Sequence, residues 1–253
     1  MSSSRRLPLA FAVFALWIIV TVYGARLIYG TGVSLLDLVR HGVALNILAA
    51  AGLTVLACLV FGWRDMAAGP PRPGSLRLLW FPLLYLALLF GLGIVSGLPP
   101  VATLAFLAVN TVLVGLSEEL MFRGILFRSL LTRMPIWPAI VATSVLFGSV
   151  HILNGFGTGD WGSAAVQALA AGLSGLTLMA ILLRTGSILV AMAYHAAWDL
   201  ATFTVAASQA TTAGQGATFS AIAAAVVPVL FVLPNALYGL YLMRHIGRDG
   251  EAA

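Results

Sequence analysis

The sequence predicts an all-α, polytopic integral membrane protein with about eight transmembrane helices. Of its 253 residues, 61% are apolar and 8% are charged, whereas a soluble domain is about 45–50% apolar and about 25% charged. The apolar residues form continuous runs rather than an alternation, which favours membrane helices over the strands of a barrel. The arginines lie mainly at the ends of these runs. Together these observations exclude an ordinary soluble domain.

Eight apolar runs have about the length that spans the hydrocarbon core of a bilayer, near 20 residues. In chain order they are residues 7–25, 43–63, 78–95, 101–116, 136–153, 164–183, 187–207 and 219–243. The first run follows Arg5 and Arg6, as the core of a signal peptide does. It is long for such a core, and no small-residue cleavage site follows it. We therefore expect it to be a retained membrane anchor.

The charged residues predict the orientation and exclude nucleic acid as a partner. The net charge is +5, and all 13 basic residues are arginines. They do not form the basic stripe of a nucleic-acid-binding domain. With the N-terminus inside, the inner segments hold Arg5, Arg6, Arg64, Arg72, Arg77, Arg123, Arg128, Arg133, Arg184, Arg244 and Arg248. The outer segments hold Arg26 and Arg40, so the positive-inside rule places both termini in the cytoplasm.

A loop rich in proline and glycine, residues 67–75, follows the second run. It separates an N-terminal transmembrane hairpin and loop, residues 1–75, from a membrane-embedded region, residues 76–253, with a catalytic core at about 101–207. The lone cysteine, Cys58, excludes an intrachain disulfide and a multi-cysteine metal site.

Ionisable residues within membrane helices are costly and therefore indicate function. The first cluster contains Glu118, Glu119 and Arg123. Glu119 and Arg123 are four residues apart and share a helix face, with the acid first, which favours pairing. Glu118 is rotated by about 100° and lacks that partner. Among apolar residues an unpaired carboxylate binds a proton more readily, which suits a general base. The alternative is that both acids mark the cytoplasmic end of the fourth helix.

Two further clusters lie on later helices. Phe147 and His151 are four residues apart, and so are His195 and Asp199. Each histidine could instead be structural, with His195 and Asp199 joining two helices. Because the three clusters lie on separate helices in one stretch, we expect them to converge on one buried polar pocket. Other polar residues in the runs are expected to form interhelical hydrogen bonds: Asn110, Gln167 and Asn235.

The ordered motifs Glu-Glu-x-x-x-Arg, Phe-x-x-x-His and His-x-x-x-Asp resemble those of the CPBP family. This family of CAAX proteases and bacteriocin-processing proteins, also called Abi, includes the type II CAAX prenyl endopeptidases. The resemblance covers about residues 101–207. It implies an intramembrane endopeptidase that acts on a peptide or protein substrate, lipidated or membrane-embedded. The lack of lysine and the abundance of alanine and arginine are typical of bacterial proteins, so we expect a multi-pass protein of the bacterial inner membrane.

The resemblance also implies a role for each motif residue. Glu118 and His151 would activate the attacking water, and Glu119 and Arg123 would support the site. His195 and the polar residue four positions later would hold the oxyanion. That last residue is Asn in the CAAX endopeptidases and Asp in other members.

Here that position is Asp199, which changes the chemistry, because an ionised carboxylate only accepts hydrogen bonds. Asp199 could donate to an oxyanion if protonated, orient His195 by accepting its ring proton, or bind a metal. Two histidines and a carboxylate can hold catalytic zinc. A zinc-dependent mechanism and a metal-independent glutamate mechanism both stay open.

Two other functions are compatible with a polar pocket in membrane helices. One is a non-enzymatic scaffold or immunity protein of the same fold, against which the complete set of motif residues argues. The other is a proton-coupled transporter, which discontinuous helices in inverted repeats would favour. The sequence shows neither feature.

The positions of the histidines along their helices are a difficulty for a shared site. At about 1.5 Å rise per residue, His151 lies roughly 9 Å deeper from the inner side than His195. Helix tilt, a later start of the fifth helix, or a 121–135 segment that dips into the membrane could remove this difference.

Overall fold

The computed structural model describes residues 3–212 and 221–247, and this part of the chain is helical without a strand. Seven helical segments in it are long and apolar enough to cross a membrane: Arg5–Tyr29, Ser75–Val95, Val101–Leu130, Ile136–Thr158, Trp161–Thr185, Ile188–Ser208 and Val226–Met243. The remaining predicted run forms the shorter apolar helix Leu45–Phe61. The all-α, multi-pass membrane fold is therefore confirmed. Phe219, where the last run was expected to begin, and Arg248 lie outside the described residues.

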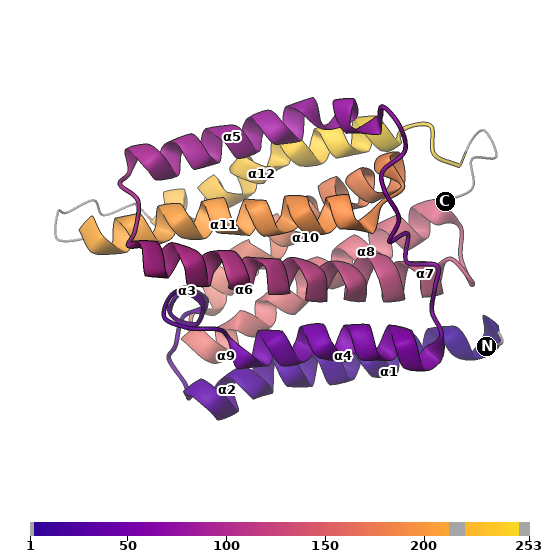
Figure 1. Ribbon diagram of the computed structural model, residues 1–253, viewed down its shortest axis with the longest axis horizontal. Helices are drawn as coiled ribbons and strands as arrows, with labels where there is room; N and C mark the ends of the chain where they lie inside the picture. Colours follow the sequence, from indigo (N-terminus) through magenta and orange to yellow (C-terminus); the bar gives the residue numbers. More distant parts are fainter. Residues whose placement is uncertain (1–2, 213–220, 248–253) are drawn as a thin grey trace.

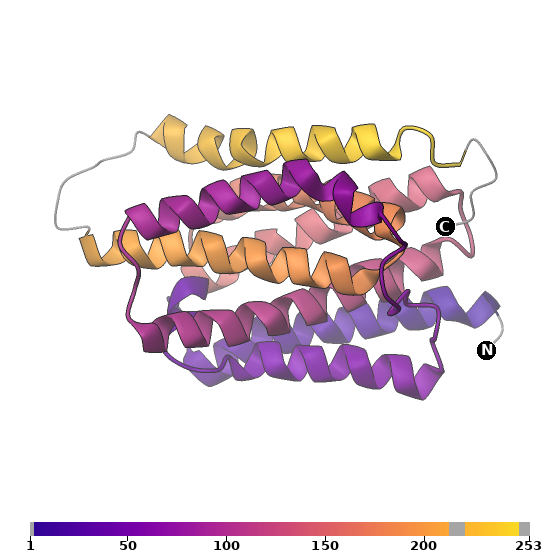
Figure 2. The same ribbon diagram turned by 45° about the horizontal axis from the view of Figure 1, so that its top comes forward.

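The helices form an elongated bundle whose members lie roughly along one axis (Figures 1 and 2). The long helices are α1 (Ser3–Ile18), α4 (Leu45–Phe61), α5 (Trp80–Val95), α6 (Val101–Glu119), α8 (Ile136–His151), α10 (Trp161–Thr185), α11 (Ile188–Thr212) and α12 (Ala221–Met243). Short helices join them: η1 (Ile19–Tyr23), α2 (Gly24–Tyr29), α3 (Leu35–Arg40), η2 (Ser75–Leu79), η3 (Leu120–Leu126), α7 (Phe127–Leu130), η4 (Ile152–Asn154) and α9 (Gly155–Thr158). In both views α1 and α4 form one side, α5 and α12 form the other, and α6 and α11 lie between them.

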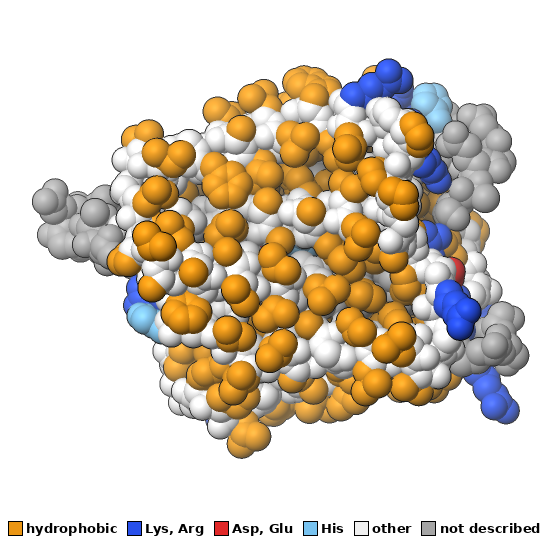
Figure 3. Space-filling view, in the orientation of Figure 1, with side chains coloured by type: hydrophobic (Ala, Val, Ile, Leu, Met, Phe, Trp, Pro, Cys, Tyr) orange, Lys and Arg blue, Asp and Glu red, His pale blue; other side chains and the backbone are white. Residues whose placement is uncertain are grey.

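The outer surface suits a lipid environment. Apolar side chains cover the face seen in Figure 3, and the blue basic side chains gather mainly at one end. Leu59 and Val60 on α4 and Leu88 on α5 are more than 60% exposed. In water this exposure would be unfavourable, whereas in hydrocarbon it costs nothing.

The arginines are distributed unequally between the two ends of the bundle. The start of α1 and the end of α12 lie at the same end (Figure 1). The connection between α4 and η2, which contains Arg64 and Arg72, and the end of α10, with Arg184, lie there too. Arg26 and Arg40 belong to α2 and α3 at the opposite end. We propose that the arginine-rich end faces the cytoplasm.

The sequence pattern places Arg123 among the inner segments that flank the membrane spans, but it lies in the buried π-helix η3, within the candidate span Val101–Leu130. The view that the two glutamates mark a helix end is also wrong. A continuous helical segment of 30 residues runs from Val101 to Leu130. The helix can pass through charged residues because Glu119 and Arg123 pair with each other inside the protein. The segment after Glu119 continues as helix to Leu130, within the candidate span Val101–Leu130.

Two glycines allow the helices that carry the motifs to pack closely. A Cβ atom on Gly115 of α6 would lie 2.8 Å from the carbonyl oxygen of Met192 on α11. A Cβ atom on Gly148 of α8 would lie 2.6 Å from the carbonyl oxygen of Ala168 on α10. Small residues at such crossings let backbones approach. The first contact joins two motif helices, α6 and α11, and the second joins the motif helix α8 to α10.

Candidate active site

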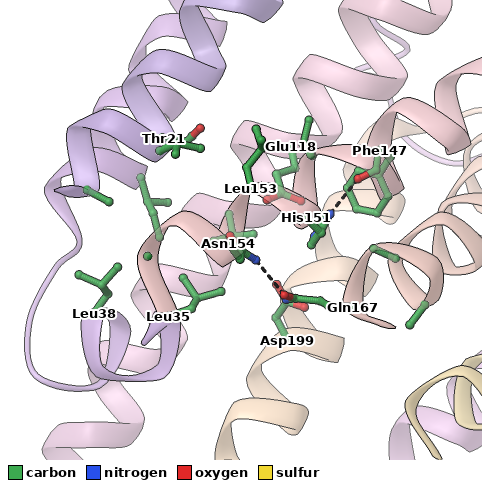
Figure 4. Close-up of a pocket in the computed structure, with 18 of the residues that line it drawn as sticks. Thr21, Leu35, Leu38, Glu118, Phe147, His151, Leu153, Asn154, Gln167 and Asp199 are labelled. Carbon is green, nitrogen blue, oxygen red and sulfur yellow. Dashed lines mark hydrogen bonds between the residues drawn. The ribbon is translucent and has the colours of Figure 1, made fainter. Parts of the chain in front are cut away.

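A cavity of about 810 Å³ lies within the bundle, and residues of all three motifs line it. Glu118 of α6, His151 of α8, and His195 and Asp199 of α11 line it. Figure 4 shows Glu118, His151 and Asp199 directed into this space. The three clusters therefore converge on one cavity, as expected, and the calculated difference in depth does not separate the histidines.

Glu119 and Arg123 lie behind the cavity wall as a buried ion pair. Nη1 of Arg123 donates to Oε1 of Glu119 at 3.0 Å, and both side chains are fully buried. Nη2 of Arg123 donates to the carbonyl oxygen of Gly175 at 3.2 Å, and the guanidinium lies 4.3 Å from the centre of the Phe147 ring. The predicted pairing is confirmed.

His195 is held in place by the same glutamate. Nδ1 of His195 donates to Oε1 of Glu119 at 2.8 Å. Its Nε2 is 3.8 Å from Oε2 of Glu118 and 3.6 Å from Oδ2 of Asp199. Glu119, rather than Asp199, therefore accepts the Nδ1 proton and fixes the ring. The remaining ring nitrogen is left facing two carboxylates.

His151 has one ring nitrogen engaged by its own helix. Its Nδ1 lies 2.8 Å from the carbonyl oxygen of Phe147, shown as a dashed line in Figure 4. A carbonyl oxygen only accepts, so Nδ1 carries the hydrogen and Nε2 of the neutral ring is an acceptor. The Phe147 ring packs edge-on against both histidines, at 5.1 Å from His151 and 5.8 Å from His195.

A protein-family model matches the part of the chain that carries these motifs. Residues 100–201 match the family model for type II CAAX prenyl endopeptidase Rce1-like. The resemblance inferred from the three motifs is confirmed over this Rce1-like segment, which implies a peptidase that acts within the membrane. No curated protein matches the chain significantly.

The donor atoms do not form a metal centre as they stand. Among residues 3–212 and 221–247, no group of three or more His, Cys, Asp or Glu side chains has an arrangement that could hold a metal ion. Because Nδ1 of His195 and Nδ1 of His151 are engaged by Glu119 and Phe147, Nε2 is the nitrogen that each ring presents to a ligand.

Residues outside the Rce1-like segment complete the cavity, and the motif patterns do not reveal them. Trp17 of α1 lines the cavity, and its Nε1 donates to Oγ of Ser117 at 2.8 Å. Its ring packs edge-on against Phe122 at 5.6 Å. This contact joins residues 100 positions apart, so no local spacing predicts it.

The other polar residues singled out from the sequence form hydrogen bonds between helices, and two of them also line the cavity. Asn110 joins α6 to the segment around α3, because its Nδ2 donates to the carbonyl oxygens of Val39 and Gly42. Nδ2 of Asn235 on α12 lies 3.3 Å from Oη of Tyr194 on α11. The predicted interhelical bonds of Asn110 and Asn235 are confirmed, and so is that of Gln167, which joins α10 to Asn154 of η4. Gln167 accepts from Asn154 at 2.9 Å, and it lines the cavity (Figure 4), as does Asn235.

Proposed function

We propose that the protein is an intramembrane endopeptidase that hydrolyses a peptide bond in or near the bilayer with a water molecule activated by Glu118 and His151. One observation carries the proposal. Three separate helices direct Glu118, His151, His195 and Asp199 into a single cavity inside a membrane-spanning bundle. Such a cavity supplies water and catalytic groups at a depth where neither is otherwise present.

In this mechanism Glu118 is the general base. Its side chain reaches the cavity, and Oε2 of Glu118 lies 3.8 Å from Nε2 of His195, so the carboxylate is not locked in a close ion pair. Glu118 takes a proton from water while Nε2 of His151 accepts the second hydrogen bond of that water. The water oxygen attacks the scissile carbonyl carbon. The C–N bond then breaks, and Glu118 delivers its proton to the leaving amine.

His195 stabilises the oxyanion. The bond from Nδ1 to Glu119 fixes the ring so that Nε2 faces the cavity. In its doubly protonated form His195 donates from Nε2 to the developing negative charge, and the carboxylate of Glu118 lies close enough to balance the imidazolium charge. Glu119 and Arg123 act as positioning residues, because they touch His195 and Phe147 rather than the cavity.

The test is cleavage of a library of membrane-segment and C-terminally lipidated peptides by the purified protein in detergent, with and without a chelator. We expect cleavage that resists chelation and that Glu118→Gln abolishes. Asp37→Asn is the matched control, because Asp37 lies outside the cavity in an ion pair with Arg40. Activity lost with the chelator and restored by zinc would contradict the metal-free mechanism. A folded protein that cleaves none of the peptides would argue against the peptidase proposal.

A further inference from the structure

The reacting end of the cavity has few neutral hydrogen-bond donors. In the neutral rings of His151 and His195 the hydrogen is on Nδ1, so Nε2 of each ring accepts. Ionised Glu118 also only accepts, and Asp199 can donate only when it is protonated. When His195 is doubly protonated, its Nε2 hydrogen faces two carboxylates, at 3.8 and 3.6 Å. An oxyanion formed here would compete with them for that single hydrogen.

Ser117 offers a donor in the right place. Val114, Ser117 and Glu118 line the cavity, and their spacing of three and four residues places them on one face of α6. Ser117 is 2% exposed. Its Oγ accepts the indole hydrogen of Trp17 at 2.8 Å, and within the described residues no group accepts the hydroxyl hydrogen in turn. The hydroxyl therefore has a hydrogen available beside the proposed base.

The indole of Trp17 makes this hydroxyl a better and more rigid donor. Trp17 is 4% exposed and fixed edge-on against Phe122. A hydroxyl that accepts a hydrogen bond is polarised and donates more strongly. Because Trp17 already occupies one side of Oγ, the hydroxyl hydrogen must point elsewhere. Most other hydroxyls of the neighbouring helices donate back to a backbone carbonyl, as Thr143 and Ser149 do, whereas Ser117 does not.

We propose that the Ser117 hydroxyl, oriented by Trp17, is a second oxyanion donor of this site. The proposal rests on the peptidase function proposed above. It adds a catalytic donor that needs no protonation, unlike His195 and Asp199, and it makes α1, which lies outside the Rce1-like segment, part of the catalytic apparatus.

The experiment compares Ser117→Ala with the wild type on a peptide that the wild type cleaves. Loss of one oxyanion donor typically lowers kcat by about 100–1000-fold. We expect such a loss with KM nearly unchanged. Binding of a phosphonate analogue of the tetrahedral intermediate should weaken by a similar factor, while binding of the product peptide should not change. Trp17→Phe keeps the aromatic packing and should lower kcat less than Ser117→Ala.

Two variants separate catalysis from folding. In Ser117→Ala the Trp17 indole loses its acceptor, so Tm should fall, whereas the double variant Trp17→Phe, Ser117→Ala removes both partners and should recover Tm but not kcat.

Ser144→Ala is the matched control, because that hydroxyl is also buried on a neighbouring helix but does not line the cavity. The kcat of this control should match that of the wild type. A Ser117→Ala protein with wild-type kcat and analogue affinity would overturn the proposal, since the hydroxyl would then bind only cavity water. Absence of cleavage by the wild type would instead count against the peptidase function itself.

Discussion

At the scale of single residues, Glu119 is the centre of the site although it does not line the cavity. One of its oxygens accepts hydrogen bonds from both Arg123 and His195. The buried guanidinium thus sets the position of the carboxylate, which sets the position of the imidazole. Glu118, the adjacent residue, is rotated toward the cavity instead. Two neighbouring glutamates therefore have separate roles.

The first prediction distinguishes these roles. Glu118→Gln should reduce cleavage by at least about 100-fold, because the general base is lost, while Tm stays close to that of the wild type. Glu119→Gln should reduce both cleavage and stability, because it leaves the guanidinium of Arg123 uncompensated, at a cost of about 3–5 kcal/mol. Thermal unfolding in detergent and peptide cleavage measure the two effects. Equal stability of the two variants would show that the ion pair is not structural.

The second prediction concerns Asp199, whose Oδ2 is 3.6 Å from His195 Nε2. We favour a protonated Asp199 that donates to the oxyanion, so Asp199→Asn should keep substantial activity and Asp199→Ala should lose it. The wild type should lose activity as the pH rises and Asp199 ionises, because the donor hydrogen is then lost. The Asn variant does not titrate and should stay active to higher pH. Cleavage rates across pH, with metal content measured in parallel, provide the test. If both variants lose activity equally, the donor role is wrong, and loss of metal with activity would indicate ligation.

Much at this scale could be predicted from spacing, because residues four apart share a helix face. The pairing of Glu119 with Arg123 and the proximity of His195 to Asp199 follow from that rule. The bond from His195 to Glu119 does not, because it joins different helices. Nor does the bond from Trp17 to Ser117. The catalytic roles of the six motif residues stay predictions.

At the scale of elements, the sequence predicted every long helix but not how the fourth one ends. Hydropathy falls at the charged motif, so the apolar run stopped at residue 116, whereas the helical segment continues to Leu130. Hydropathy describes a residue facing lipid, and Glu119 and Arg123 face each other inside the protein. The π-helix η3 lies at this point. Such irregular turns are frequent at functional sites.

The third prediction tests the close contact of α8 with α10. Gly148→Ala would place a methyl group 2.6 Å from the carbonyl oxygen of Ala168, and a backbone atom cannot move aside as a flexible side chain can. We expect a loss of about 1–3 kcal/mol and reduced cleavage, because His151 is three residues further along α8. Gly52→Ala on α4 is the control, with open space around the new methyl group. Comparable Tm values for these two variants would contradict the close packing.

At the scale of the whole molecule, the unequal distribution of arginines predicts the orientation in the membrane. The fourth prediction is that the loop between α4 and η2 lies in the cytoplasm. In a Cys58→Ala background, Ala68→Cys should resist an impermeant thiol reagent applied to intact cells, whereas Thr31→Cys, in the connection between α2 and α3, should react. Both positions are exposed in the structure. The reverse pattern would invert the topology.

The long helical segment that contains the motif also has a consequence for how the chain enters the membrane. It carries Glu118, Glu119 and Arg123 near its middle, and a charged residue at a helix centre costs about 2.5–3.5 kcal/mol on insertion scales. Released alone into lipid, this segment would insert poorly. During synthesis, however, α1 and α4 emerge first, and Trp17 is then available as a partner for Ser117. We expect the first two helices to assist its insertion, so that residues 101–130 integrate efficiently in a fragment of residues 1–130 but stay largely outside the bilayer in a fragment of residues 76–130, although α5 inserts in both.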